Sequence, residues 1–231
     1  MTTTTHTTDR WLVGAAWAGI IGPILFTVTW FAQEIFLTDG YSPLKQPVSA
    51  LAAWPHGWVQ NLNFVVLGLL TLGFAAGLHR GLAPSRFAIA GPVLFAVTGV
   101  GALWAAVFPI RMDAAGVPYD PGLHLVGGLM FFPVSALALV VISFRVARDR
   151  DWAPLAIPVR VAGILIIATI PAMIIFVGPE DAPLHDWFGL FQRVLVVLIF
   201  TARIALSYRL LRTAGDSQLR GAVRPRYLSG A

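Results

Sequence analysis

The sequence predicts an all-α integral membrane protein with six transmembrane helices. The chain of 231 residues is 57% hydrophobic and only 12% charged, and its mean hydropathy is +0.76. A soluble domain carries about twice that charged fraction, so the apolar surface is too large for one water-soluble core. Six apolar stretches are each long enough to cross a bilayer, which takes about 20 residues in a helix.

The six predicted helices follow one another without an inserted soluble domain. They span residues 11–33, 58–78, 87–110, 123–144, 154–177 and 187–208. Residues 1–10 form a polar tail, 11–212 the transmembrane domain, and 213–231 a basic tail that we expect to be disordered. The first stretch is longer than a signal-peptide core and no A-x-A-like site closes it, so we expect it to be retained.

The placement of Lys and Arg predicts the orientation of the bundle. Cytoplasmic connections carry an excess of these residues, and one set of helix ends holds eleven of them while the opposite set holds only Lys45 and Arg111. The bias alternates with every crossing, which predicts that both termini are cytoplasmic. The eleven residues are Arg10, Arg80, Arg86, Arg145, Arg148, Arg150, Arg209, Arg212, Arg220, Arg224 and Arg226.

The first outer connection, residues 34–57, is the longest linker. Its segment SPLKQPVSALAAW predicts a short re-entrant or amphipathic helix, with Pro47 suited to the first turn. In the second helix, GFAAG places Gly73 and Gly77 four residues apart, a spacing that lets two backbones approach closely. We interpret this spacing as packing within the chain rather than as a dimer contact.

Composition excludes several classes of function. The net charge of +5 does not indicate a nucleic-acid partner, because the Arg residues lie between apolar segments and not on one basic face. The chain has no cysteine, so disulfides and thiolate chemistry are excluded. No Walker or Rossmann fingerprint is present.

Acids and imidazoles concentrate on the predicted outer face. Seven of the eleven acids lie there: Glu34, Asp39, Asp113, Asp120, Glu180, Asp181 and Asp186. Three of the five His residues, His56, His124 and His185, lie there too. We therefore expect any site to open toward the extracytoplasmic side.

Arg193 is the central candidate, because it lies inside the sixth predicted helix. It is six residues beyond Trp187, or about 9 Å deeper at 1.5 Å per residue. One interpretation is that its side chain extends outward to the interface. The other is that it faces the bundle and pairs with an acid, Glu34 or Asp113, because an unpaired charge facing lipid is costly.

Catalytic and metal chemistry are weaker alternatives. Asp113, His124 and His185 could supply metal ligands or act on a metal-bound water, but no H-x-x-x-H or H-E-x-x-H spacing supports this. Ser49 lacks a nucleophile elbow, and a helix N-cap is the simpler interpretation. The sequence therefore leans away from an enzyme and predicts no cofactor.

Several short motifs occur in an order that resembles the domain of unknown function 998 family. They are YSP at 41–43, VSAL at 48–51, NLNF at 61–64, Phe-Pro followed by Asp113, then His124, and QR at 192–193. The chain departs from the family pattern at Ala52, where Gly is expected, and in the wider spacing from Phe-Pro to Asp113. The resemblance implies a multi-pass bacterial or archaeal membrane protein without a known reaction, and it adds weight to Ser49, Asn61 or Asn63, Asp113, His124, Gln192 and Arg193.

These observations lead to three functional hypotheses. The first is recognition or transport of a small amphiphile or lipid headgroup in a polar cavity open to the outside of the cell membrane, with membrane lipids as partners. Its ligand-binding residues would be Arg193, Gln192, Asn63, His124, Asp113, Glu34 and Ser49. The second is a metal-dependent intramembrane hydrolase, and the third is a non-catalytic subunit of a membrane complex. The sequence leaves the oligomeric state open.

Overall fold

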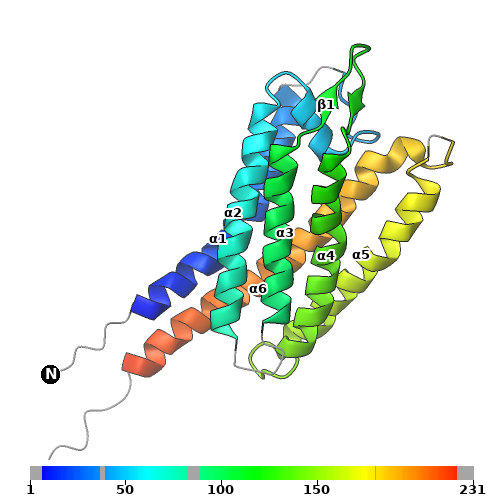
Figure 1. Cartoon of the computed structure of the whole chain (residues 1–231). Helices are drawn as coiled ribbons and strands as arrows, with labels where there is room; N and C mark the ends of the chain where they lie inside the picture. The colour runs from blue at the N-terminus through cyan, green and yellow to red at the C-terminus, as the bar shows by residue number, and fades with distance from the viewer. Residues whose placement is uncertain (1–6, 37–39, 83–88, 180, 223–231) are drawn as a thin grey trace, which may run out of the picture.

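A computed structural model describes residues 7–36, 40–82, 89–179 and 181–222. Within these ranges the chain forms six long helices, each apolar and long enough to cross a membrane (Figure 1). They are α1 (Thr7–Phe36), α2 (Trp58–Gly81), α3 (Ala90–Val107), α4 (Leu123–Val146), α5 (Ala156–Phe176) and α6 (Phe188–Ala222). The predicted six-helix membrane bundle is confirmed.

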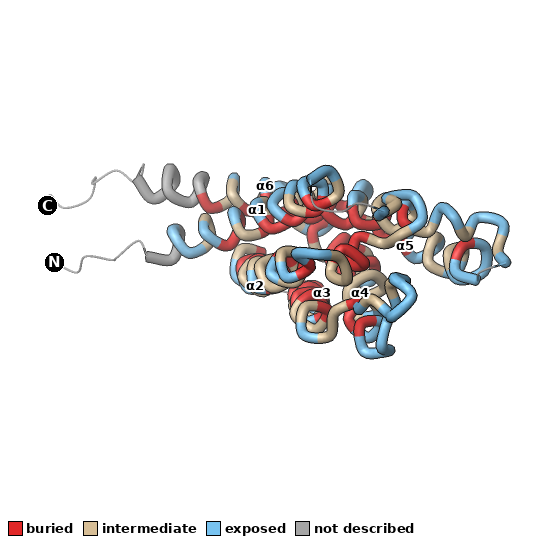
Figure 2. Tube along the Cα trace, turned by 90° about the horizontal axis from the view of Figure 1, so that it is seen from above, coloured by how far each residue is buried: buried red, intermediate tan, exposed pale blue. Residues whose placement is uncertain are grey.

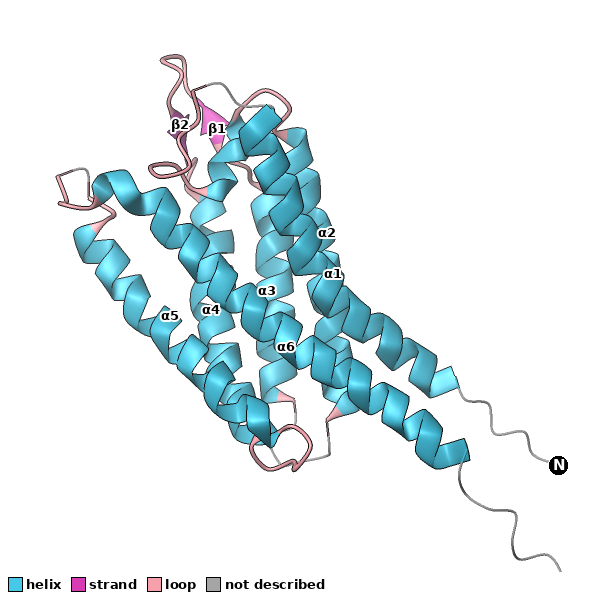
Figure 3. Cartoon of the chain, turned by 180° about the vertical axis from the view of Figure 1, so that it is seen from behind, coloured by secondary structure: helices cyan, strands magenta, loops and turns pink. Residues whose placement is uncertain are grey.

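The helices form a closed ring in which each one packs against its neighbours in sequence and α6 returns to α1. Figure 2 shows this arrangement from above, with α1 and α6 beside each other and α2, α3 and α4 in a second row. The start of α1 and the end of α6 lie at the same end of the bundle (Figure 3). We call the opposite end, which carries the α1–α2, α3–α4 and α5–α6 connections, the hairpin end.

Three short helices and a two-stranded hairpin complete the fold. They are η1 (Val48–Ala53), η2 (Ala153–Leu155), η3 (His185–Trp187), β1 (Arg111–Met112) and β2 (Pro118–Tyr119). The strands are antiparallel, with Arg111 opposite Tyr119, and they pack against η1. The helix expected in the first connection is η1, a single 3-10 segment, and the hairpin was not predicted from the sequence.

Glycine lets α2, α3 and α4 pack backbone to backbone. A Cβ added to Gly127 would lie 2.9 Å from the Gly101 carbonyl oxygen, and one on Gly68 would lie 2.8 Å from that of Gly99. Gly77 plays the same part against α1, since its Cβ would lie 2.5 Å from that of Ala15. The Gly73–Gly77 spacing therefore serves packing within the chain, as predicted.

Helix boundaries differ from the sequence expectation most clearly at three places. The first helix begins at Thr7 and not at residue 11, so residues 7–10 of the expected polar tail are helical. The third helix ends at Val107 and not at residue 110, because Phe108 precedes Pro109 and proline disfavours helical backbone in the residue before it. The sixth helix continues to Ala222, so residues 213–222 of the tail expected to be disordered are helical. Residues 1–6 and 223–231 of the predicted tails lie outside the described residues.

The fifth helix packs least tightly. Of its most apolar 18-residue segment, only 22% is buried inside the bundle, against 50% for the corresponding segment of α6. Figure 3 shows that toward the hairpin end α5 leans away from α4 and meets the start of α6. This separation matters because α5 lines a cavity of about 670 Å³.

Candidate functional site

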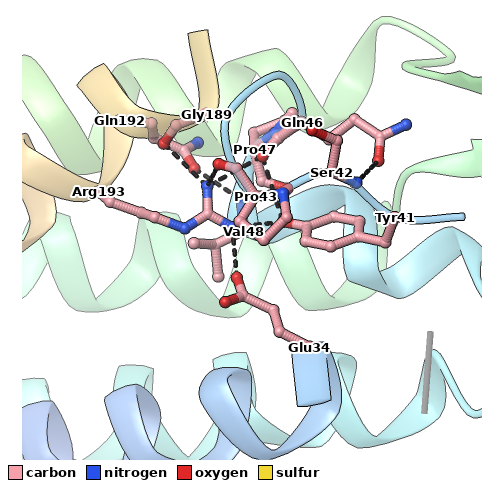
Figure 4. A network of polar contacts seen from close by, with 10 residues as sticks. All are labelled: Glu34, Tyr41, Ser42, Pro43, Gln46, Pro47, Val48, Gly189, Gln192 and Arg193. Atoms are coloured by element: carbon pink, nitrogen blue, oxygen red, sulfur yellow. Dashed lines mark hydrogen bonds and ion pairs between the residues drawn. The ribbon is translucent and has the colours of Figure 1, made fainter. Parts of the chain in front are cut away.

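Arg193 joins three parts of the chain at the hairpin end (Figure 4). Its Nη1 donates to three carbonyl oxygens: Pro43 at 2.6 Å, Gln46 at 3.0 Å and Gly189 at 2.8 Å. Its Nη2 donates to the Tyr41 hydroxyl at 2.6 Å and to the carboxylate of Glu34. One guanidinium thus holds α6, the end of α1 and the loop before η1 together.

The ion pair expected for Arg193 is present, and its acid is Glu34. The Arg193 side chain is 11% exposed and that of Glu34 is 7% exposed, so the pair is largely removed from solvent. Both Nη nitrogens are fully engaged within the protein, which leaves Arg193 no free pair of donors for an external anion. We therefore assign Arg193 and Glu34 to positioning the loop rather than to direct contact with a ligand.

The first residue of the YSP motif, Tyr41, completes this network. Its hydroxyl donates toward the Pro47 and Gln46 carbonyl oxygens, at 3.0 Å and 3.2 Å, while it accepts from Arg193. Burial raises the pKa of Tyr41 to about 12, although Arg193 acts in the opposite direction. The phenol therefore stays protonated at neutral pH and keeps its donor.

Gly189 and Gln192 bring the same loop against α6. The Leu190 amide donates to the Leu44 carbonyl at 3.1 Å, and the Gln192 side-chain oxygen accepts from the Val48 amide at 2.8 Å. A Cβ on Gly189 would lie 2.4 Å from the Pro43 carbonyl oxygen. Only glycine leaves room for this approach, so the loop and the start of α6 form one rigid unit. We call the loop of residues 41–48, together with its contacts to Glu34, Gly189, Gln192 and Arg193, the loop clamp.

Beneath the loop clamp lies a cavity of about 670 Å³, lined by residues of all six helices and of η1. Its lining is almost wholly apolar. Phe131, Phe132 and Leu129 come from α4, Ile170 and Met173 from α5, and Leu195 and Val196 from α6.

Polar side chains line this cavity only toward the hairpin end. They are Ser49 of η1, Asp120 before α4, His124 of α4 and Gln192 of α6. The loop clamp therefore determines where Ser49 and Gln192 lie relative to the apolar cavity. We call these four residues the polar rim.

His124 is oriented within the polar rim by the chain itself. Its Nδ1 lies 2.9 Å from the Phe108 carbonyl oxygen, which can only accept a hydrogen bond. Nδ1 must therefore carry the proton, and in the neutral ring Nε2 is an acceptor. His124 is 8% exposed and lines the cavity, so Nε2 is the nitrogen available to a bound molecule.

Asp113 does not reach the site, and the prediction that it could pair with Arg193 is wrong. Its Oδ1 accepts from the backbone amides of Ala115 and Val117, at 2.9 Å and 2.7 Å, and the residue is exposed in the turn of the hairpin. Short polar side chains favour such local backbone bonds. Asp113 therefore stabilises the turn between β1 and β2.

Asn63 also lies outside the residues that line the cavity. Its Nδ2 donates to the Phe26 carbonyl oxygen at 3.0 Å and approaches the Gln60 side chain at 3.4 Å. The side chain is buried between α2 and α1, where an unpaired amide would be costly. Its hydrogen bonds join two helices.

The metal set considered from the sequence is not brought together. Asp113 belongs to the hairpin turn, His124 faces the apolar cavity, and His185 lines a separate, smaller pocket. Across the described ranges, no three His, Asp or Glu side chains are grouped as a metal site requires. The hydrolase hypothesis therefore loses the zinc-type ligand set on which it rested.

Three residues of the site were not predicted. Tyr41 carried a signal only through the YSP motif, and Gly189 only through its place one turn before Arg193. Asp120 looked like ordinary turn chemistry, and its Oδ1 does accept from the Gly122 and His124 amides at 2.7 Å and 3.2 Å. The same residue nevertheless lines the cavity, which no local pattern indicates.

Comparison with known proteins identifies a family but no function. Searches against curated proteins and against solved structures returned no match. One family model, described as protein of unknown function, matches residues 20–209, a range that includes the loop clamp, the cavity and all six helices in whole or in part. The chain is therefore a member of the DUF998 family, as its motifs suggested.

Proposed function

We propose that this protein binds a membrane lipid by taking a hydrocarbon chain into the cavity beneath the loop clamp. The observation that carries the proposal is the arrangement of that cavity, which is apolar along its depth and polar only at the hairpin end. Ligand sites of this kind bury an apolar body and orient it with a few polar groups. A lipid has the same division between tail and head.

The sides of the cavity support entry from the bilayer. Leu125 and Leu129 of α4 and Ile174 of α5 line the cavity, yet they are 59%, 57% and 68% exposed. Exposed apolar residues of a membrane-spanning helix face lipid chains rather than water. A lipid can therefore enter sideways between α4 and α5 without leaving the membrane.

The polar rim would meet the ester or linker region of such a lipid. The Gln192 Oε1 is held by the Val48 amide, so its NH₂ group remains as a donor. Ser49 offers a hydroxyl, and His124 offers Nε2 as an acceptor. These three groups can hydrogen-bond a bound lipid without a change in charge.

The leaflet follows from the proposed orientation. The Lys and Arg asymmetry favours a cytoplasmic location for the termini of the bundle, because basic connections remain inside. The hairpin end would then face the outside of the cell membrane. The bound lipid would come from the outer leaflet.

Native mass spectrometry of the purified protein tests the proposal. The protein in mild detergent should retain lipid, and Gly128→Trp should abolish retention by filling the cavity. Gly128 lines the cavity, and a Cβ there meets nothing within 4 Å, so the variant can fold. The matched control is Gly14→Trp, because Gly14 is equally unobstructed but lies on α1 away from the cavity.

Two results would overturn the proposal. One is protein that carries no lipid after gentle extraction and takes none up from added vesicles. The other is equal lipid retention by Gly128→Trp and the Gly14→Trp control. Either result would leave the cavity without a demonstrated ligand.

Labelling of single cysteines tests the orientation separately. The chain has no cysteine, so each introduced thiol is unique. Cysteines at Gly116 and Pro183 should react with an impermeant reagent in intact cells, and one at Asp149 should not. The reverse pattern would place the hairpin end in the cytoplasm.

A further inference from the structure

A second pocket of about 340 Å³ lies at the hairpin end, next to the 670 Å³ cavity that we propose takes a lipid chain. The two share Pro47, Ile110 and Asp120 as lining residues, so they adjoin at the polar rim. The second pocket is also lined by Lys45, Gln46, Tyr119, His185 and Asp186. We call it the charged pocket, because each of its three charged side chains comes from a different connection.

The order of chemistry from one pocket to the other is that of a phospholipid. An apolar cavity receives chains, the polar rim offers hydrogen bonds, and the charged pocket offers full charges of both signs. Lys45 and Asp186 form an ion pair at 3.1 Å, with side chains 58% and 65% exposed. Both remain open to solvent and so to an incoming headgroup.

The balance of charge decides which headgroup fits. The charged pocket holds one ammonium, from Lys45, and two carboxylates, from Asp120 and Asp186, so its formal charge is −1 with His185 neutral. A headgroup with net negative charge is disfavoured there. A headgroup that carries a phosphate and a cationic amine matches both signs.

The residues that line the charged pocket indicate which kind of cationic headgroup it accepts. Quaternary ammonium groups are recognised by cages of several Trp, Tyr or Phe rings, whereas Tyr119 is the one residue of these three types that lines this pocket. Asp120 uses Oδ1 for the Gly122 and His124 amides, which leaves Oδ2 as an acceptor. Carboxylate acceptors suit a primary ammonium, because each of its N–H groups can donate.

We propose that the charged pocket selects phospholipids whose phosphate headgroup ends in a primary ammonium, as in phosphoethanolamine. The phosphate lies toward Lys45 and His185, and the ammonium lies toward Asp120 and Asp186. This inference rests on the proposed lipid-binding function and specifies its substrate class. It makes the headgroup, not the chain, the basis of selectivity.

Binding measurements with three lipids of identical oleoyl chains test the inference. The headgroups are phosphoethanolamine, phosphocholine and phosphoglycerol, each titrated against the detergent-purified full chain by native mass spectrometry. Phosphoethanolamine should bind about tenfold more tightly than the other two, the effect of one charge-assisted hydrogen bond. Asp120→Asn should remove this preference while its side-chain oxygen still accepts from the two amides.

Two residues of the β1–β2 hairpin, Arg111 and Asp113, provide matched controls for Lys45 and Asp120. Lys45→Gln should weaken binding of all three phosphate lipids, whereas Arg111→Gln should not, because Arg111 lines neither pocket. Asp113→Asn should likewise leave the preference intact. These pairs separate a local effect from a general change in surface charge.

The outcomes of these measurements distinguish headgroup selection from the proposed lipid binding on which it rests. Equal affinity for the three headgroups, or a preference for phosphoglycerol or phosphocholine, would overturn headgroup selection and leave chain binding in place. Loss of preference in Asp113→Asn as well as Asp120→Asn would also overturn it. Failure of all three lipids to bind would overturn the proposed function itself.

Discussion

Two arginines on α6 differ in how the protein accommodates their charge. Arg193, near the hairpin end, has a carboxylate, a phenol and three carbonyls as partners. Arg203 lies ten residues deeper and is 2% exposed. Among the described residues, no carboxylate lies within ion-pair distance of Arg203.

The surroundings of Arg203 show what replaces a counterion. Its Nη1 donates to the Thr71 hydroxyl at 2.6 Å, its Nη2 reaches the Ala18 carbonyl oxygen at 3.3 Å, and its guanidinium lies 5.3 Å from the centre of the Phe74 ring. These neutral contacts connect α6 to α2 and α1. The comparison indicates that Arg193 fixes a charged network, whereas Arg203 fills a neutral helix interface.

The largest expected effect comes from removing Arg193. Arg193→Ala leaves the Glu34 carboxylate buried without its cation, which costs about 3–5 kcal/mol for a largely desolvated pair. The apparent Tm in detergent should fall clearly, and proteolysis within residues 41–48 should accelerate. The double variant with Glu34→Gln should lose less than the sum of the single losses; additive losses would show that the two residues act independently.

A smaller loss is expected from adding a single methyl group to the loop clamp. Gly189→Ala places a Cβ 2.3 Å from the Gln46 carbonyl oxygen, so the loop must move away from α6. Overpacking of this kind costs about 1–3 kcal/mol. The control Gly14→Ala, on an unobstructed helix position, should keep or raise the Tm; equal Tm values for the two variants would contradict the rigid clamp.

Stability at alkaline pH tests the contribution of the Tyr41 phenol to the loop clamp. Because the folded pKa of Tyr41 is raised from 10.0 to about 12, its contribution to stability is intact below pH 10.0 and is lost as the pH rises toward 12. The Tm should therefore fall between about pH 10 and about pH 12. Tyr41→Phe should reduce that fall, while Tyr119→Phe, at an exposed tyrosine, should not.

The smallest expected effect is at Arg203. Arg203→Met removes a charge without leaving a carboxylate uncompensated, and replacing buried ions with apolar groups is often neutral or stabilising. We expect a change in unfolding free energy of less than about 1.5 kcal/mol. A loss as large as that of Arg193→Ala, measured in the same detergent, would show that Arg203 has a charged partner and would end the contrast between the two arginines.

The sequence by itself determined the membrane class, the six helices and the place of Arg193 inside the sixth helix. Each of these depends on residues close together in the chain, such as an apolar run or the six positions from Trp187 to Arg193. An acid beside Arg193 was one of two interpretations that the sequence allowed, the other being a side chain that extends outward to the interface. These inferences required no knowledge of which helices are neighbours.

Only the tertiary structure decided which residues meet. Glu34 and Asp113 were equivalent as partners of Arg193 in the sequence, but the ring of helices places α1 beside α6 and leaves Asp113 to its own turn. The same packing brings Ser49, His124 and Gln192, which are far apart in the chain, to one cavity. A cavity is the space left between packed helices, so its lining depends on helix order and tilt, which no local pattern encodes.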